Sequence, residues 1–134
     1  MRVLVCGGRD YADESAVCAI LNCLNDWWGI DCIIEGGALG ADRFARRWGA
    51  WVDGLVTTYE ADWSAGRRAG PIRNQRMLDE GRPDVVVAFP GGTGTRDMVR
   101  KARAAGVPVM EIPRAPLRPR VSWGFEPTAD NSAT

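Results

Sequence analysis

The chain has 134 residues, of which 46% are hydrophobic and 25% charged, a composition typical of one globular domain. Its 17 basic residues balance its 17 acidic residues, whereas a dedicated DNA-binding domain is usually more basic, so no nucleic-acid partner is expected. The sequence contains no histidine, which excludes histidine nucleophile pairs, histidine general bases and histidine-ligated metals. No apolar run approaches the roughly 18–20 residues that span a bilayer, so we expect a cytoplasmic protein with no membrane partner.

The four cysteines, Cys6, Cys18, Cys23 and Cys32, form no C-x-x-C pair. A zinc ribbon or a thioredoxin-type motif is therefore not predicted, and we expect four reduced, buried thiols. No metal and no cofactor are expected.

Short apolar runs and helical periodicity alternate along the chain. In order, the patterns predict a strand over 2–6, a helix over 14–27, a strand over 31–35, a helix over 41–51, a strand over 55–59, a helix over 72–80, a strand over 84–89, a helix over 95–105 and a strand over 107–112. We expect Asp13 to cap the first helix, Pro71 to begin the third and Gly106 to close the fourth. Pro108 suits an edge strand.

Alternation of continuously apolar strands with helices indicates a parallel sheet covered on both faces. The sequence therefore predicts an α/β fold: a small doubly wound parallel sheet of about five strands over residues 1–112. Residues 113–134 are rich in proline and polar residues and predict a C-terminal tail, partly disordered, with Trp123 and Phe125 as anchors.

Four glycine-rich turns follow predicted strands, and the ligands of open parallel sheets bind outside the carboxyl ends of the strands. Glycine lets the backbone approach a phosphate closely, and helix N-termini supply free N–H groups. The turns therefore predict a phosphate-bearing, nucleotide-like ligand. The candidate ligand-binding residues in or beside these turns are Gly7, Gly8, Arg9, Asp10, Glu35, Gly36, Gly37, Gly40, Asp42, Trp63, Asn74, Pro90, Gly91, Gly92, Thr93, Gly94 and Thr95.

These signals differ in specificity. The Pro-Gly-Gly-Thr-Gly-Thr run over 90–95 is the strongest, while one Gly-Gly after a strand can be a plain turn, and no P-loop motif is present. Arg73, expected in a first helical turn, either contacts ligand phosphate or ribose or pairs with Asp97 or Asp62. Asp42 and Asp97 are expected in first turns, where an acid is stabilising in any case.

Aromatic residues leave two interpretations open. Tyr11 and Trp63 either stack on a base or anchor their loops. The helical tryptophans belong to the core or to an interface, and their number predicts a homodimer or higher homo-oligomer; they are Trp27, Trp28, Trp48 and Trp51.

Five motifs, taken in order, resemble the SLOG superfamily, named for the Smf/DprA and Lonely Guy proteins, and most closely its YspA-like branch. They read GGRDY, EGGALGAD, ADW, AGPIRNQRM and AFPGGTGT within residues 1–112. The resemblance implies a Rossmann-like fold and a nucleotide-type ligand at the glycine-rich edge. Members sense, bind or cleave nucleotide derivatives, and some sit beside defence systems or in phage genomes.

Lonely Guy enzymes hydrolyse the N-glycosidic bond of nucleoside 5′-monophosphates with an arginine and a glutamate. The resemblance places these catalytic roles on Arg73, four positions before Met77, and on Asp97, two positions after Thr95. Aspartate is one methylene shorter than glutamate, and a displacement of about 1 Å can lower a rate about a hundredfold. The departure favours binding over hydrolysis.

The first hypothesis is therefore a sensor or sequestering protein for a nucleoside phosphate, an ADP-ribose or a cyclic nucleotide, in phage or defence signalling. The alternative is a phosphoribohydrolase that cleaves nucleoside 5′-monophosphates without a metal, and the sequence leaves open whether the protein is an enzyme. Single-stranded DNA binding, by analogy with the DprA branch, is disfavoured by the balanced charge.

Overall fold

The computed structural model describes residues 1–114. Its elements in chain order are β1 (Arg2–Cys6), α1 (Glu14–Trp28), β2 (Cys32–Glu35), α2 (Ala41–Trp51), β3 (Leu55–Thr58), the 3₁₀ helix η1 (Trp63–Arg68), α3 (Ala69–Asp79), β4 (Val85–Ala88), α4 (Thr93–Ala104) and β5 (Val109–Glu111). The anchors expected at Trp123 and Phe125, and all but the start of the predicted tail, lie outside the described residues.

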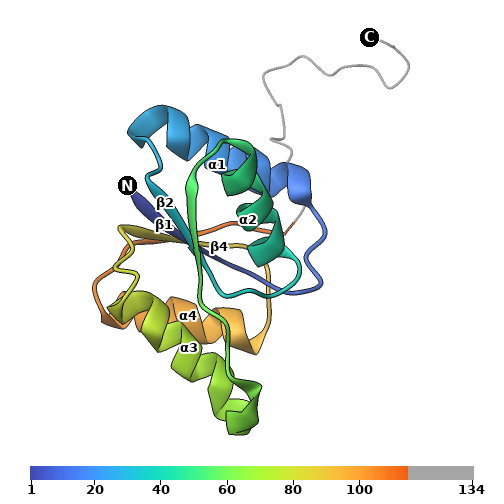
Figure 1. Ribbon diagram of the computed structural model, residues 1–134, viewed down its shortest axis with the longest axis vertical. Helices are drawn as coiled ribbons and strands as arrows, with labels where there is room; N and C mark the ends of the chain where they lie inside the picture. Colours follow the sequence, from blue (N-terminus) through green and yellow to red (C-terminus); the bar gives the residue numbers. More distant parts are fainter. Residues whose placement is uncertain (115–134) are drawn as a thin grey trace, which may run out of the picture.

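The five strands form one parallel sheet in the order β3-β2-β1-β4-β5 (Figure 1). In the centre of the sheet, Leu4 of β1 lies opposite Ile34 of β2 and Val86 of β4. The chain builds outward from β1 to β3 and then returns to place β4 on the other side of β1. This reversal creates a topological switch point between β1 and β4, the place where open α/β sheets bind ligands. The predicted fold class is confirmed, and β5 takes the predicted edge position.

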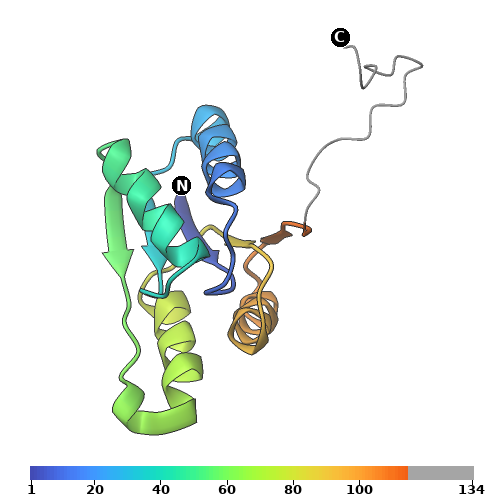
Figure 2. The ribbon, with the colours of Figure 1, turned by 90° about the vertical axis from the view of Figure 1, so that its right-hand side faces the viewer.

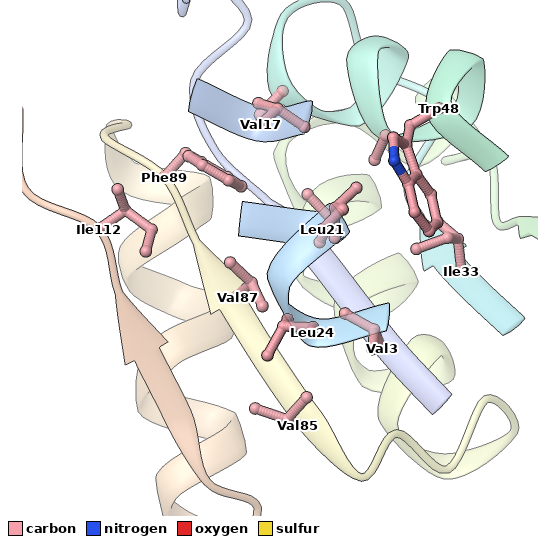
Figure 3. Close-up of a cluster of buried hydrophobic side chains, with 13 residues drawn as sticks. Val3, Val17, Leu21, Leu24, Ile33, Trp48, Val85, Val87, Phe89 and Ile112 are labelled. Carbon is pink, nitrogen blue, oxygen red and sulfur yellow. The ribbon is translucent and has the colours of Figure 1, made fainter. Parts of the chain in front are cut away.

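Helices cover both faces of the sheet (Figure 2). Successive strand residues point to opposite faces, so the apolar strands present hydrophobic side chains on each side, and both sides must be covered. Val3 and Val5 of β1 pack in the cluster that α1 and α2 cover, which also contains Leu21 and Trp48 (Figure 3). Leu4 and the other alternate strand residues belong to a second cluster, beneath α3 and α4. Two apolar layers therefore hold the sheet from either side.

Two helices begin earlier than the sequence predicts. α3 begins at Ala69, so Pro71 is its third residue, and α4 begins at Thr93 after Gly92. Proline and glycine are tolerated there because the first N–H groups of a helix have no intrahelical partner. As a result, Arg73 and Asp97 are each the fifth residue of their helix and lie beyond the first turn, which corrects the expectation for both.

The 3₁₀ helix η1 is not predicted from the sequence. Asp62 accepts hydrogen bonds from the backbone nitrogen and the hydroxyl of Ser64, at 3.1 and 2.6 Å, and so holds its first turn. Gly66, with a φ of 69°, kinks it before α3 begins. Because η1 buries none of its residues, its sequence has no apolar periodicity from which a helix could be predicted.

The helical tryptophans divide into two groups. Trp48 is buried and its indole N–H donates to Asn22 Oδ1 at 2.9 Å, whereas Trp27, Trp28 and Trp51 are exposed. Homo-oligomer formation stays a prediction.

All four cysteines are free thiols, as predicted, but only Cys6 and Cys32 are buried. Cys18 is half-buried and Cys23 is exposed, because neither is among the residues that α1 buries in the core. Between residues 1 and 114, no helix combines the length and the apolar character needed to cross a bilayer.

Candidate functional site

A cavity of about 360 Å³ opens at the carboxyl edge of the sheet, beside the switch point between β1 and β4. Polar backbone and side chains line much of it. It brings together most of the predicted ligand-binding residues, namely Gly7, Gly8, Arg9, Gly36, Gly37, Asp42, Trp63, Asn74, Gly92, Thr93, Gly94 and Thr95, together with Arg73. In open parallel sheets, ligands bind outside the carboxyl ends of the strands. Residues chosen from the sequence by that rule lie around one cavity in this structure.

Six predicted residues do not line this cavity: Asp10, Glu35, Gly40, Pro90, Gly91 and Asp97. Asp10, Pro90 and Gly91 line a smaller hollow beyond the turn that follows β4. Sequence reasoning missed five cavity residues, which are Cys6, Ala38, Glu60, Ala61 and Met77. Glu60 and Ala61 follow β3 directly, so the same strand-end rule could have found them.

The glycines of these turns fall into two groups, those that close packing requires and those that it does not. A Cβ on Gly40, whose φ is +75°, would lie 2.2 Å from the carbonyl oxygen of Gly8, and one on Gly91 would lie 2.7 Å from the nitrogen of Gly8. These glycines let the turns after β1, β2 and β4 pack together. A Cβ on Gly92 or Gly94 would meet nothing within 4 Å, so no packing contact within residues 1–114 demands glycine there.

The N-terminus of α4 lies at the cavity. Gly92 caps the helix without a side-chain hydrogen bond, and no acidic residue occupies the first turn. Thr93, Gly94 and Thr95, the first three helical residues, all line the cavity. Their N–H groups lack intrahelical partners, and the positive end of the helix dipole adds to them, an arrangement suited to an anion.

The side chain of Arg73 projects from α3 into the same cavity. Its Nη1 donates to the carbonyl oxygen of Gly36 and its Nε donates to Asn74 Oδ1 at 3.1 Å. No carboxylate of residues 1–114 pairs with this guanidinium, so the structure forms neither the Asp97 nor the Asp62 ion pair considered from the sequence. The remaining N–H groups of Arg73 are available to a ligand.

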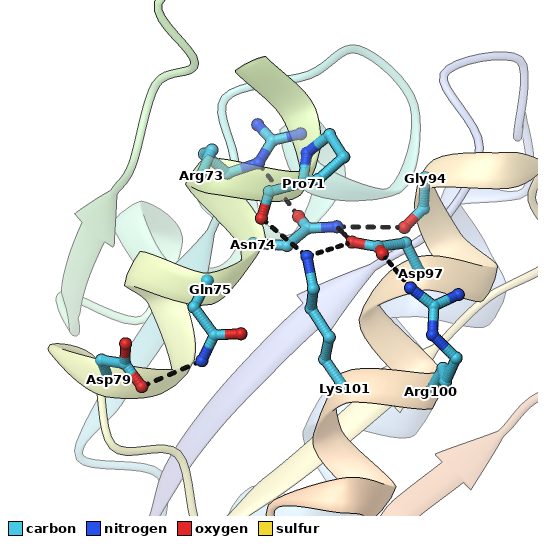
Figure 4. A network of polar contacts seen from close by, with 9 residues as sticks. All are labelled: Pro71, Arg73, Asn74, Gln75, Asp79, Gly94, Asp97, Arg100 and Lys101. Atoms are coloured by element: carbon cyan, nitrogen blue, oxygen red, sulfur yellow. Dashed lines mark hydrogen bonds and ion pairs between the residues drawn. The ribbon is translucent and has the colours of Figure 1, made fainter. Parts of the chain in front are cut away.

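Asn74 is a buried side chain whose amide is fixed from both ends (Figure 4). Its Nδ2 donates to Asp97 Oδ2 at 3.0 Å and to the carbonyl oxygen of Gly94 at 3.1 Å. Since an ionised carboxylate can only accept, the amide nitrogen must face Asp97, which leaves Oδ1 for Arg73. The first turn of α4 and the guanidinium of α3 are thereby held in one arrangement.

Asp97 stands behind this arrangement. It accepts from Arg100 at 2.6 Å and from Lys101 at 2.9 Å, and Lys101 also donates to the carbonyl oxygen of Pro71. Burial would raise the pKa of Asp97, but hydrogen bonds from Lys101 and Asn74 outweigh it and lower the pKa below its usual value. The carboxylate is therefore ionised at neutral pH, and its catalytic role stays a prediction.

Two further carboxyl groups, those of Asp42 and Glu35, lie at the turn after β2. Asp42 accepts from the backbone nitrogens of Gly36 and Ala38, at 2.9 and 3.4 Å. Burial, and next the charge of Glu35, raise the pKa of Asp42 to about 6. Glu35 is wholly buried and accepts from Gly37 N at 2.7 Å and from Thr58, so it shapes the turn and is not presented to a ligand.

Other chemistry is limited at the cavity. Burial raises the pKa of the Cys6 thiol, with a further rise from the charge of Asp42, so Cys6 is a neutral thiol and a poor nucleophile. Within the described part of the chain, no three cysteine, aspartate or glutamate residues gather to hold a metal ion. The groups that can act on a ligand are arginines, carboxyl groups, hydroxyls and backbone N–H groups.

Two comparisons place this chain among known proteins. Residues 1–66 match the sequence model of a family described as "YspA, cpYpsA-related SLOG family". The chain is also 39% identical over 122 residues to the gene 61 protein of Mycobacterium phage D29, in an alignment that covers 83% of this chain and 95% of that protein. The family match contains the turns that follow β1, β2 and β3.

Proposed function

The chain belongs to the YspA, cpYpsA-related SLOG family, and we propose that it binds a nucleotide-derived small molecule in this cavity. Family membership indicates a nucleotide-related ligand that is bound or processed. The finer proposal is a sensor or sequestering protein, in which binding itself is the function. We propose that this binding serves phage or defence signalling, and the similarity to a phage protein supports the phage setting.

One observation supports phosphate binding above all others. The N-terminus of α4, which has no side-chain cap, and the Arg73 guanidinium, which has no carboxylate partner within residues 1–114, both face one cavity. A phosphate there would accept from backbone N–H groups and from a charged fork that matches its geometry. Asn74 supports this reading because it links both groups rigidly.

Hydrolysis of an N-glycosidic bond is the second candidate, and the position of Asp42 is what favours it. Asp42 lines the cavity and its pKa of about 6 suits proton transfer near neutral pH. Asp97, which the resemblance assigned to catalysis, does not line the cavity and is engaged by two cations. If the protein is a hydrolase, we therefore propose Asp42 as its carboxyl group.

Calorimetry of the whole chain with nucleoside monophosphates, ADP-ribose and cyclic dinucleotides tests the binding proposal. We expect Arg73→Ala to lower the affinity for the best ligand about ten- to hundredfold, because a charge-assisted hydrogen bond contributes roughly 1.5–3 kcal/mol. Arg76→Ala is the matched control, since Arg76 lies on the same helix, pairs with Glu80 and does not line the cavity.

The two candidate functions separate in one further measurement. Chromatography of the same mixtures detects free base if a nucleoside monophosphate is cleaved, and Asp42→Asn should then abolish the release. Binding without release of base supports the sensor. Failure of every phosphorylated ligand to bind below about 1 mM, or equal binding by wild type and folded Arg73→Ala, would refute the phosphate site.

A further inference from the structure

We propose that Trp63 and Glu60 form a nucleoside subsite at the β3 end of the cavity, where Trp63 stacks on the base and Glu60 accepts ribose hydroxyls. The ligand class is then a nucleoside 5′-phosphate, as opposed to a bare sugar phosphate or an inorganic anion. This inference rests on the proposed phosphate site and names what lies at its far end.

The strand order arranges the residues that line the cavity in a row along the carboxyl edge of the sheet. Along the sheet β3-β2-β1-β4, the turn after each strand contributes in sequence Glu60, Gly36, Gly7 and the start of α4. Three inter-strand spacings of about 4.8 Å make roughly 14 Å between the ends. A phosphate, a ribose and a base laid end to end fill such a length, with the phosphate at α4.

Trp63 supplies the apolar surface at the β3 end. The chain continues past the carboxyl edge of the sheet from β3 before it turns back into α3 (Figure 2), and η1, which begins with Trp63, lies in that excursion. The Trp63 side chain is 62% exposed and lines the cavity. An indole on the rim of a polar cavity suits a base, since every base offers a face for stacking.

Position separates Trp63 from the other exposed tryptophans. Trp27, Trp28 and Trp51 stand at the C-terminal ends of α1 and α2. These helices return antiparallel to the strands, so their C-terminal ends lie at the opposite edge of the sheet. Trp63 therefore has a ligand site beside it that the others lack.

Glu60 makes the β3 end of the cavity negatively charged, whereas the protein groups at the α4 end, which would hold the phosphate, are positive. Its side chain lies near Gly37, where an added Cβ would be 3.3 Å from Glu60 Cγ. Among residues 1–114, no hydrogen bond or ion pair of a protein group engages its carboxylate, although it lines the cavity. A carboxylate repels a phosphate but accepts two neighbouring hydroxyls, which fixes the direction of the ligand.

Calorimetry with AMP, GMP, CMP, UMP and ribose 5-phosphate tests the subsite. We expect Trp63→Ala to weaken the tightest-bound monophosphate roughly 5- to 150-fold and to change ribose 5-phosphate less than about twofold. Trp63→Phe should restore most of the loss. Trp51→Ala, which removes an indole that is 80% exposed at the opposite edge, should change neither ligand.

Glu60→Gln tests the sugar contact separately. Wild type should prefer the ribonucleotide to its 2′-deoxy form about ten- to hundredfold, as one hydrogen bond to a charged acceptor allows. The amide oxygen of the variant makes only a neutral hydrogen bond, so its preference should fall to about two- to twelvefold. Circular dichroism checks that each variant is folded.

Three outcomes overturn the subsite: Trp63→Ala weakens the monophosphate and ribose 5-phosphate equally, it weakens neither, or it changes only the mass of an oligomer. The proposed function fails differently, because wild type would then bind none of these ligands, and neither ADP-ribose nor a cyclic dinucleotide, below about 1 mM. Binding of ADP-ribose or a cyclic dinucleotide without any monophosphate would overturn the subsite alone.

Discussion

Gly94→Ala should stabilise the protein and weaken its ligand binding at the same time. Gly94 is the second residue of α4, and an added Cβ meets nothing within 4 Å. In a helix, alanine is about 0.5–1 kcal/mol more favourable than glycine. We expect a gain of about 0.5 kcal/mol at this terminal position, which raises the melting temperature of a domain of this size by roughly 2 °C.

The same methyl group occupies space at the edge of the cavity that Gly94 lines. It would hold a phosphate away from the first N–H groups of α4, and we expect the affinity for a nucleoside monophosphate to fall about tenfold or more. Melting curves recorded at rising ligand concentration show both effects. The variant should melt higher without ligand and lower at saturation, because a ligand at about 100 times its dissociation constant adds roughly 2.7 kcal/mol.

Two results would refute this reasoning. Unchanged or tighter binding by Gly94→Ala would mean that the phosphate does not approach the start of α4. A melting temperature below that of wild type, with no ligand present, would mean that the first turn needs glycine for its own conformation.

Three further predictions concern charged side chains. Arg73→Lys should recover only part of the affinity that Arg73→Ala loses, in calorimetry, because an ammonium cannot form the bidentate fork. Asp97→Asn should lower affinity severalfold although Asp97 does not line the cavity, since Asn74 can then flip and release Arg73; equal affinity at matched salt would contradict that link. Because burial raises the pKa of Asp42 from 3.8 to about 6, the folded state holds its proton more tightly. The stability this proton contributes is complete below pH 3.8 and is lost as the pH rises through about 6, about 3 kcal/mol in all. Asp42→Asn should remove that dependence in urea titrations at pH 4 and pH 8.

The sequence predicted the three inner strands well because they are short, mostly apolar runs with both faces covered, as at Val85–Ala88. The edge strands β3 and β5 are partly exposed, and their β-branched residues and the glycine turns around them marked them instead. It misplaced the starts of α3 and α4, because Pro71 and Gly92 are typical of turns. A helix start demands no N–H donor from its first residues, so those starts extend into such turns. The 3₁₀ helix that begins at Trp63 has no buried face and left no periodic pattern to detect.

For the site, the rule of strand ends identified glycines that do gather at one cavity. It could not tell which acidic side chains face it, because that depends on helix phase and on partners distant in sequence. Asp97 has Arg100 and Lys101 three and four residues later, a spacing that brings side chains together on one face of a helix. Read with that rule, the sequence indicates a paired acid at this position. The burial of Glu35 depends on Thr58 in the neighbouring strand, a contact that no local pattern reveals.

The place of β1 between β2 and β4 has a consequence for how the site comes into being. Residues 1–66 contain β1, β2 and β3, but the second neighbour of β1 begins only at Val85. A nascent or truncated chain that ends before β4 lacks that neighbour and the start of α4, and one that ends before α3 lacks Arg73 as well. Ligand binding therefore reports completion of the sheet through β4 together with the start of α4. A bound nucleotide should slow hydrogen exchange across the central strands, and not only in the turns it touches, because those strands open together with the cavity.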